Sequence, residues 1–328
     1  MQGVIQEPEY WPWIKELTRL KQGQPDGDVR RDCLLAAEEN RRTGVAFAAE
    51  HSDRPFAGEA MRSAGLDGAI FQEIITFFER ENREGKLQLV DQKAHLNEQA
   101  LGKPVFRALH AYYTVDRGTL EDYGSSDRPV SIHVAETEEE SLFTREGTGR
   151  IADFYGANNV TFEPTGLSVV ESLGQLGLLR KGVQFVHCCA LSEEDLDILS
   201  RSRVTVAHCP RSNQRLKCPP APVRELLDAG VAVGFGLDSA ASSGPIDMFA
   251  EMRAAQEVSL SRGRAVSPEE VWRMAASMGA SALESYGCPQ KWDVEPGSFV
   301  PLIKLHVENA FCVEDLIEAS RPELVEWV

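Results

Sequence analysis

Four short apolar segments set the strongest limit on how this chain can fold. They cover residues 130–135, 183–188, 203–207 and 231–236, and each is bounded by Gly, Pro or charged residues. Segments this short and this apolar are typical of parallel strands that are buried on both faces. The intervals between them leave room for helices, as repeated βα units require. The pattern therefore predicts an α/β protein built on a parallel barrel.

Each of these segments delivers a polar side chain at or just beyond its carboxyl end. The side chains are those of His133, Glu136, His187, His208 and Asp238. His187 and His208 are 21 residues apart (208 − 187), and His208 and Asp238 are 30 apart (238 − 208). Each of these two intervals has room for one helix. In a parallel barrel the carboxyl ends of neighbouring strands converge on one mouth. We therefore expect these five side chains to face one another.

The rest of the chain continues the alternation of strand and helix. Strands are also expected at 45–49, 69–71 and 105–109, and helices at 10–20, 26–42 and 168–179. Residues 222–229 bridge towards the strand that precedes Asp238, and residues 247–260 follow it. Ser192 and Ser267 are each followed by acids at the spacing that begins a helix. Alternating residues from Phe299 to Val307 predict a strand outside the barrel.

Length and charge narrow the class of protein. The chain of 328 residues is long enough for one barrel of about 250 residues with additions. Its net charge of −17 repels phosphate groups, so we expect neither nucleic acid nor an anionic membrane as a partner. No apolar run reaches the roughly 18 residues that span a bilayer. Seven cysteines without a Cys-x-x-Cys pair favour a reduced, cytoplasmic protein.

Four motifs occur in a fixed order between residues 133 and 239. They are His-Val-Ala-Glu-Thr at 133–137, Val-His-Cys at 186–188, His-Cys-Pro-Arg-Ser-Asn at 208–213 and Gly-Leu-Asp-Ser at 236–239, and His-Ala-Tyr-Tyr-Thr at 110–114 precedes them. Together they resemble the metal-dependent amidohydrolase superfamily, in its branch of cyclic-amidine deaminases and triazine-type chlorohydrolases. The resemblance runs from about Tyr10 to the carboxyl end.

The resemblance implies a (β/α)8 TIM-type barrel with a metal centre. His133, His187 and Asp238 would bind one divalent metal, with zinc favoured over iron or manganese. Glu136 would collect a proton from the attacking water and deliver it to the substrate. His208 would hold the attacking oxygen, and Asp238 would act as the partner base.

The resemblance also implies a reaction and a substrate class. The reaction is hydrolysis of a C–N bond other than a peptide bond, above all the deamination of an aminated heterocycle of the purine, pterin, nucleoside or triazine type. His110, Tyr113 and Arg211 would contact this small molecule. The sequence does not decide among these rings.

One part of the family pattern is absent from the sequence. The family takes two further ligands from a His-x-His at the end of its first barrel strand, and the printed sequence contains no His-x-His. We therefore expect a barrel without its first strand, formed by residues 1–295, and a flanking segment at 296–328 that is the remnant of a small β-sandwich. Either the chain lacks its true amino terminus, or it is a variant with a weakened metal site.

Alternative interpretations remain open at this stage. His133 and His187 could be buried structural histidines, Glu136 could be a first-turn acid of the helix that follows, and Asp238 could cap a helix. His51 is interpreted as structural or surface. The protein could also be a metal-free ligand binder, or an inactive piece that is stable only with a partner subunit. A homodimer is compatible with the sequence.

Overall fold

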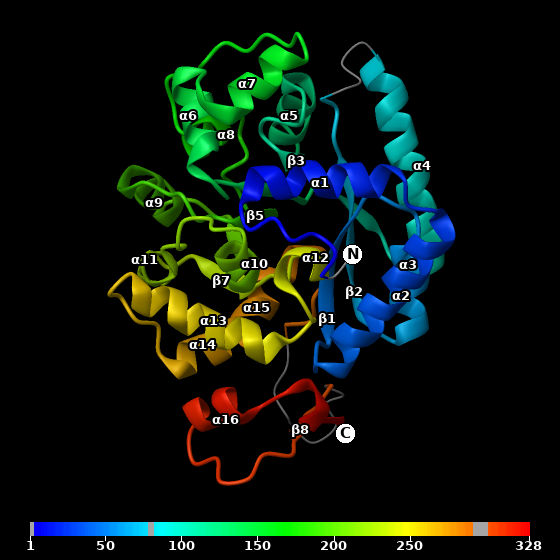
Figure 1. Cartoon of the computed structure of the whole chain (residues 1–328), viewed down its shortest axis with the longest axis vertical. Coiled ribbons are helices and arrows are strands. Elements are labelled where there is room, and N and C mark those ends of the chain that lie inside the picture. The colour runs from blue at the N-terminus through cyan, green and yellow to red at the C-terminus, as the bar shows by residue number, and fades with distance from the viewer. Residues whose placement is uncertain (1–2, 78–81, 291–300) are drawn as a thin grey trace.

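The computed structural model describes residues 3–77, 82–290 and 301–328. Seven parallel strands lie side by side in chain order and curl into an open barrel with helices around the outside (Figure 1). The strands are β1 (Phe47–Ser52), β2 (Asp67–Ile74), β3 (Val105–Ala111), β4 (Val130–Val134), β5 (Val183–His187), β6 (Thr205–His208) and β7 (Ala232–Phe235). All seven lie at or next to a segment in which the sequence predicts a strand.

Helices connect and cover the strands. They are α1 (Tyr10–Gln22), α2 (Asp26–Arg42), α3 (Ala57–Ala64), α4 (Arg83–Leu101), α5 (Arg117–Gly124), α6 (Glu138–Glu146), α7 (Gly149–Ala157), α8 (Val169–Gln175), α9 (Glu193–Ser200), α10 (Pro210–Arg215), α11 (Val223–Asp228), α12 (Ala240–Ser243), α13 (Met248–Ser261), α14 (Pro268–Ala275), α15 (Ser277–Ala282), η2 (Glu284–Tyr286), α16 (Val313–Ala319) and η3 (Pro322–Leu324). None of these helices is both long and apolar enough to cross a membrane.

The sheet of the described residues has two free edges, β1 and β7. Each inner strand pairs in parallel with its neighbours along the chain, as β4 does with β3 and β5. A closed barrel would join its last strand to its first. The fold is therefore a TIM-type barrel that lacks one strand, as the sequence predicted.

Local sequence explains the burial of strand β4 and the starts of helices α9 and α14. In β4, Val130, Ile132 and Val134 are fully buried, because this strand packs on both faces. Helices α9 and α14 begin at capping boxes, in which Ser192 bonds to Asp195 and Ser267 to Glu270 in both directions. Both starts were predicted from the sequence.

The carboxyl-terminal segment packs against the outside of the barrel. Strands β8 (Ile303–Leu305) and β9 (Val325–Trp327) form a two-stranded antiparallel sheet. Ile317 is fully buried, and the Arg253 guanidinium of α13 donates to its carbonyl oxygen at 2.7 Å. Residues 299 and 300 of the predicted strand, and the predicted boundary between 295 and 296, lie outside the described residues.

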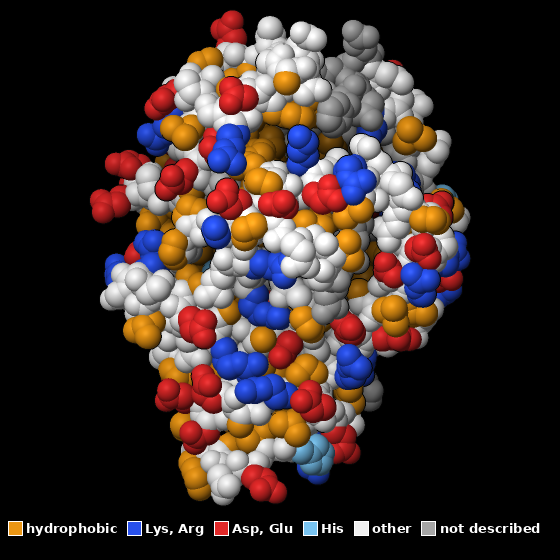
Figure 2. Space-filling view, viewed as in Figure 1, with side chains coloured by type: hydrophobic (Ala, Val, Ile, Leu, Met, Phe, Trp, Pro, Cys, Tyr) orange, Lys and Arg blue, Asp and Glu red, His pale blue; other side chains and the backbone are white. Residues whose placement is uncertain are grey.

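Charge is spread over the surface. Figure 2 shows acidic and basic side chains interspersed over the visible face, so the excess of acids that gives the net charge of −17 does not gather there in one patch.

Candidate active site

The backbone turns sharply at or just beyond the carboxyl ends of β4, β5 and β7. Ala135 follows β4 with φ of 50°, His187 ends β5 with φ of 74°, and Asp238 follows β7 with φ of 51°. Residues other than glycine are uncommon in this left-handed region, and such residues gather at functional sites. The strained turns lie at the carboxyl ends of the strands, where barrel proteins place their chemistry.

Four imidazole rings form a cluster around His133 near the carboxyl ends of β1, β3, β4 and β5. The His133 ring centroid lies 5.2 Å from that of His51, 5.2 Å from that of His110 and 5.4 Å from that of His187. Burial lowers the pKa of all four imidazoles, so they are neutral near pH 7. His51, which the sequence analysis assigned to structure or surface, is a member of this cluster.

Two of these rings are oriented by a bond at one ring nitrogen. His133 Nδ1 donates to the carbonyl oxygen of His110 at 2.6 Å, which leaves its Nε2 available. His187 Nδ1 lies 3.0 Å from the amide Nδ2 of Asn213, and the other amide atom of Asn213, Oδ1, is buried without a partner. If Oδ1 faces the ring instead, it accepts from Nδ1–H and leaves the lone pair of His187 Nε2 available.

Glu136 meets His187 from the loop after β4. Its Oε2 lies 3.7 Å from His187 Nε2, and the side chain is buried. Burial and the nearby charge of Asp238 raise the pKa of Glu136 well above its usual range, which favours the protonated form of the carboxyl group. Helix α6 begins only at Glu138, so the interpretation of Glu136 as a first-turn helix acid is wrong.

Asp238 is held at the exposed edge of the mouth. Its Oδ2 accepts from Ser212 Oγ at 2.5 Å and from Ser242 Oγ at 2.7 Å. Ser239, and not Asp238, occupies the N-cap position of α12. The alternative of Asp238 as a helix cap is therefore wrong.

His208 is buried with no hydrogen-bond partner on either ring nitrogen. Burial lowers its pKa to about 3, so the ring is neutral. A cavity of about 100 Å³, lined in part by His208, Asn213 and Cys218, adjoins the ring. A buried polar group without a partner is costly, and a ligand or water at this place would satisfy it.

The three predicted substrate contacts lie in different surroundings. His110 Nδ1 lies 2.8 Å from Thr114 Oγ1, and its Nε2 faces Glu73 at 4.0 Å. The hydroxyl of Tyr113, which is buried, lies 3.3 Å from that of Tyr10. The Arg211 guanidinium donates to the Pro245 carbonyl at 2.8 Å and pairs with Glu251 at 3.4 Å. A substrate contact by Arg211 stays a prediction.

The side chains at the mouth offer imidazole nitrogens and a carboxylate oxygen, the kinds of atom that bind a divalent metal. His133 donates from Nδ1 to a backbone carbonyl, as metal-binding histidines do, and His187 donates likewise from its Nδ1 when the Asn213 amide is turned with Oδ1 toward the ring. Asp238 keeps its Oδ1 outside the two serine bonds. Within residues 3–77, 82–290 and 301–328, however, no three His, Cys, Asp or Glu side chains already stand close enough together to hold an ion.

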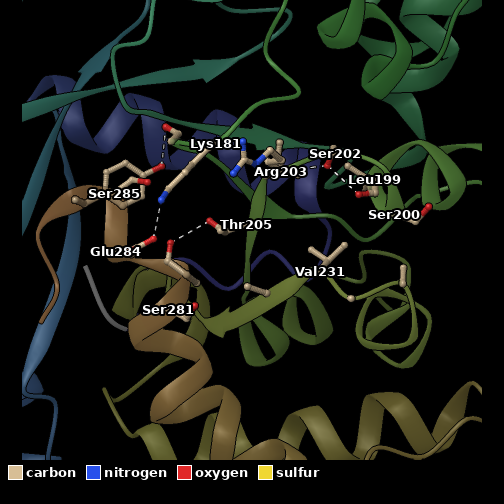
Figure 3. Close-up of a pocket in the computed structure, with 17 residues that line it drawn as sticks. Lys181, Leu199, Ser200, Ser202, Arg203, Thr205, Val231, Ser281, Glu284 and Ser285 are labelled. Atoms are coloured by element: carbon tan, nitrogen blue, oxygen red, sulfur yellow. Dashed lines mark hydrogen bonds and ion pairs between the residues drawn. The ribbon is translucent and has the colours of Figure 1, made fainter. Parts of the chain in front are cut away.

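A larger cavity lies at the opposite end of the strands. It measures about 280 Å³ and is lined by residues at the amino ends of β5, β6 and β7 together with α15 and η2 (Figure 3). Lys181 pairs there with Glu284 at 2.9 Å, and Thr205 donates to the Ala282 carbonyl at 3.1 Å. The amino ends of barrel strands generally serve stability, so the cluster of imidazoles marks the better candidate site.

Fold and site together place the chain among the α/β barrels that gather imidazole and carboxylate groups at the carboxyl ends of their strands. Residues 3–287 match the model of the amidohydrolase family, and the chain belongs to that family. The resemblance predicted from the four motifs is confirmed.

Individual relatives lie in the deaminase branch. The chain is 31% identical over 285 residues to a 5-methylthioadenosine/S-adenosylhomocysteine deaminase of Pyrococcus horikoshii, covering 84% of this chain and 62% of that protein. It is 31% identical over 284 residues to a 5'-deoxyadenosine deaminase of Methanococcoides burtonii, covering 84% and 60%. The chain thus spans less than two thirds of the length of either relative.

A solved structure shares the fold. An adenosine deaminase from Xanthomonas campestris with bound zinc superposes with a TM-score of 0.81 at 22% identity, over 99% of this chain and 74% of that one.

Sequence reasoning missed three contributors to the site. Ser212 and Asn213 belong to the motif at 208–213, but their roles in orienting Asp238 and His187 have no signal apart from that membership. Tyr10 was noted only as the start of a helix. Its contact with Tyr113 depends on how α1 crosses the barrel.

Proposed function

We propose that this chain is a metal-dependent hydrolase that removes ammonia from an aminated heterocycle. The observation that carries the proposal is the buried pair of Glu136 and His187, 3.7 Å apart and next to His133. The names of the two relatives in the deaminase branch support an adenosine-type nucleoside as the first substrate to test.

His133, His187 and Asp238 would hold one divalent metal, and these ligands suit zinc, iron or manganese. A bound ion of this kind lowers the pKa of a water molecule to near neutrality and so supplies the nucleophile.

Glu136 would move the protons. Because its pKa is raised, it begins as an acid and can give its proton to a ring nitrogen of the substrate. The resulting carboxylate then takes a proton from the attacking water as the new C–O bond forms. When the C–N bond breaks, that proton leaves with the amino group as ammonia. The remaining hydroxyl proton of the new C–O group returns to Glu136 as the carbonyl forms, which restores the acid. Neutral His208 would accept a hydrogen bond from the oxygen.

The test is ammonia release from adenosine and 5'-deoxyadenosine by the zinc-supplemented protein. We expect turnover by the wild type and a loss of about 10³-fold or more in Glu136→Gln, with an unchanged melting curve. Equal turnover by the two proteins would overturn the proposal.

The seven unpaired cysteines also support a reducing compartment such as the cytoplasm.

A second candidate function is a metal-free barrel that binds a small ligand. It is favoured by the lack of a ready three-donor cluster in the described part of the chain. Under this function, nucleoside binding measured by calorimetry would be the same with and without a chelator. If the chain is the metal-dependent hydrolase, the chelator would abolish turnover.

The free edges β1 and β7 support a third alternative, an assembly with a partner subunit or a homodimer, which sizing chromatography tests.

A further inference from the structure

The side chain of Glu140 reaches back from helix α6 to the turn that follows β4. It is buried, with 3% of its surface exposed. Its Oε2 accepts from the backbone N–H of Ala135 at 3.0 Å, and its Oε1 accepts from that of Glu136 at 2.8 Å. The two oxygens of one carboxyl group therefore hold two successive amide groups of the turn.

The turn needs such a partner because of its backbone conformation. Ala135 has a φ of 50°, in the left-handed region that residues with a Cβ atom rarely adopt. Successive N–H groups in a turn of this kind point into one concave site, which favours an anion or a carboxyl oxygen. Glu140 occupies this site with a side chain of the same chain.

The position of Glu140 in α6 could also have a purely local meaning. It is the third residue of the helix, where an acid commonly bonds the N–H of the N-cap residue and stabilises the helix start. The N-cap residue here is Thr137. The bonds at 2.8 and 3.0 Å lie one and two residues before it, so they also hold the loop that carries Glu136.

The same turn is held from its other side by the loop after β5. The carbonyl oxygen of Ala135 accepts from the N–H of Cys189 at 2.9 Å and from that of Ala190 at 2.8 Å. This loop directly follows His187, which lies 3.7 Å from the Glu136 carboxyl group. The bonds on the two sides of the turn together fix how the backbone of Glu136 lies relative to His187.

We propose that Glu140 is a positioning residue for Glu136. By holding the amide groups of Ala135 and Glu136, it fixes the backbone from which the Glu136 side chain reaches the substrate. The proposal rests on the function proposed above, in which Glu136 moves the protons. It does not depend on the protonation state of either acid, because the oxygens of a carboxyl group can accept from N–H groups in both forms.

The main experiment compares Glu140→Gln with the wild type under saturating nucleoside and zinc. The substitution keeps the shape of the side chain but replaces one oxygen with an NH2 group, which cannot accept from an N–H. We expect kcat to fall by about 10- to 100-fold with KM within about threefold, because Glu136 loses its position while the binding surface stays. A kcat within twofold of the wild-type value overturns the proposal.

Glu270→Gln is the matched control. Glu270 is also the third residue of its helix, α14. Its Oε2 accepts from the Ser267 N–H at 2.9 Å, and its Oε1 accepts from the Arg224 guanidinium at 2.7 Å. Neither partner belongs to the candidate site, so we expect a lower melting temperature and an unchanged kcat. If the two variants lose kcat equally, Glu140 has a merely structural role and the proposal fails.

A second readout needs no turnover. Hydrogen–deuterium exchange followed by mass spectrometry reports on the backbone amides of residues 134–137. We expect exchange there to be about tenfold faster in Glu140→Gln and unchanged in Glu270→Gln, because an amide that loses its acceptor is less protected. Equal exchange in the wild type and Glu140→Gln overturns the proposal.

Glu140→Asp serves if the glutamine variant does not fold. Aspartate keeps the acid but is one methylene shorter, so it cannot reach both amide groups from the same backbone position. We expect kcat to fall by about tenfold or more here too, and a kcat within twofold of the wild-type value overturns the proposal. A wild type without turnover refutes the proposed function, and the inference falls with it. An active wild type with an equally active Glu140→Gln refutes the inference alone.

Discussion

His187 Nε2 and Glu136 Oε2 lie 3.7 Å apart inside the molecule, although one ends β5 and the other follows β4. The register of these strands explains the meeting, because Val134 pairs with His187 at the carboxyl edge of the sheet. Burial favours the neutral form of both groups, because it lowers the pKa of the imidazole and raises that of the carboxyl group. The first prediction below concerns the partner that orients His187 in this pair.

Asn213→Ala should weaken zinc binding and leave the fold intact. Asn213 is the hydrogen-bond partner of His187 Nδ1, and loss of such an orienting partner costs about 10- to 100-fold in metal affinity. Competition with a chromophoric chelator measures the affinity. Asn158→Ala is the control, since the Asn158 amide bonds only the Phe154 carbonyl at an exposed helix end. Equal affinities of the two variants would contradict the role of Asn213.

Gly236→Ala should disturb the approach to Asp238. A Cβ atom at Gly236 would stand 2.5 Å from Cys209 Sγ, which is buried. Such overpacking costs about 1–3 kcal/mol of unfolding free energy, measured by urea denaturation. Adding Cys209→Ala should restore part of the loss.

Gly156→Ala is the matched control for this substitution. Gly156 lies in α7, and a Cβ atom there meets nothing within 4 Å. We expect an unchanged or slightly higher stability, because alanine favours helix more than glycine does. A loss as large as that of Gly236→Ala would show that the contact with Cys209 is not the cause.

Stability should fall as the pH rises from about 4.5 to 8, in part because of Glu251. This residue is fully buried, and burial raises its pKa to about 8. The folded state then binds a proton that the unfolded state has already released, so the stabilisation is complete below pH 4.5 and is lost as the pH passes 8. The shift corresponds to at most about 5 kcal/mol.

Urea denaturation between pH 5 and 8 measures this contribution. Glu251→Gln keeps the shape but cannot titrate, so its stability should depend less steeply on pH than that of the wild type. Parallel curves for the two proteins would show that Glu251 does not take up a proton on folding.

The local parts of the fold were predictable from the sequence. A short apolar run such as 183–188 predicts a strand from its own residues alone. An acid three residues after Ser192 or Ser267 likewise predicts the start of a helix. The family motifs located His133, Glu136 and Asp238 at strand ends. These predictions hold because each depends on neighbours in sequence.

The contacts across the barrel were not predictable in the same way. Tyr10 reaches Tyr113 only because α1 folds back over the mouth, and His51 joins His133 only because β1 and β4 end at the same edge. The direction of the Arg211 side chain is decided by the buried carboxyl group of Glu251 on α13. These side-chain contacts depend on packing between segments that are distant in the sequence. The hydrophobic periodicity within one segment does not predict such packing.

The most direct test of the account is the position of zinc in a crystal of this chain grown with the metal. Anomalous diffraction at the zinc edge should give one strong peak within about 2.0–2.2 Å of a nitrogen of His133, a nitrogen of His187 and an oxygen of Asp238. A strong peak at another place, or no peak at these three side chains with zinc in excess, would contradict the proposed metal centre.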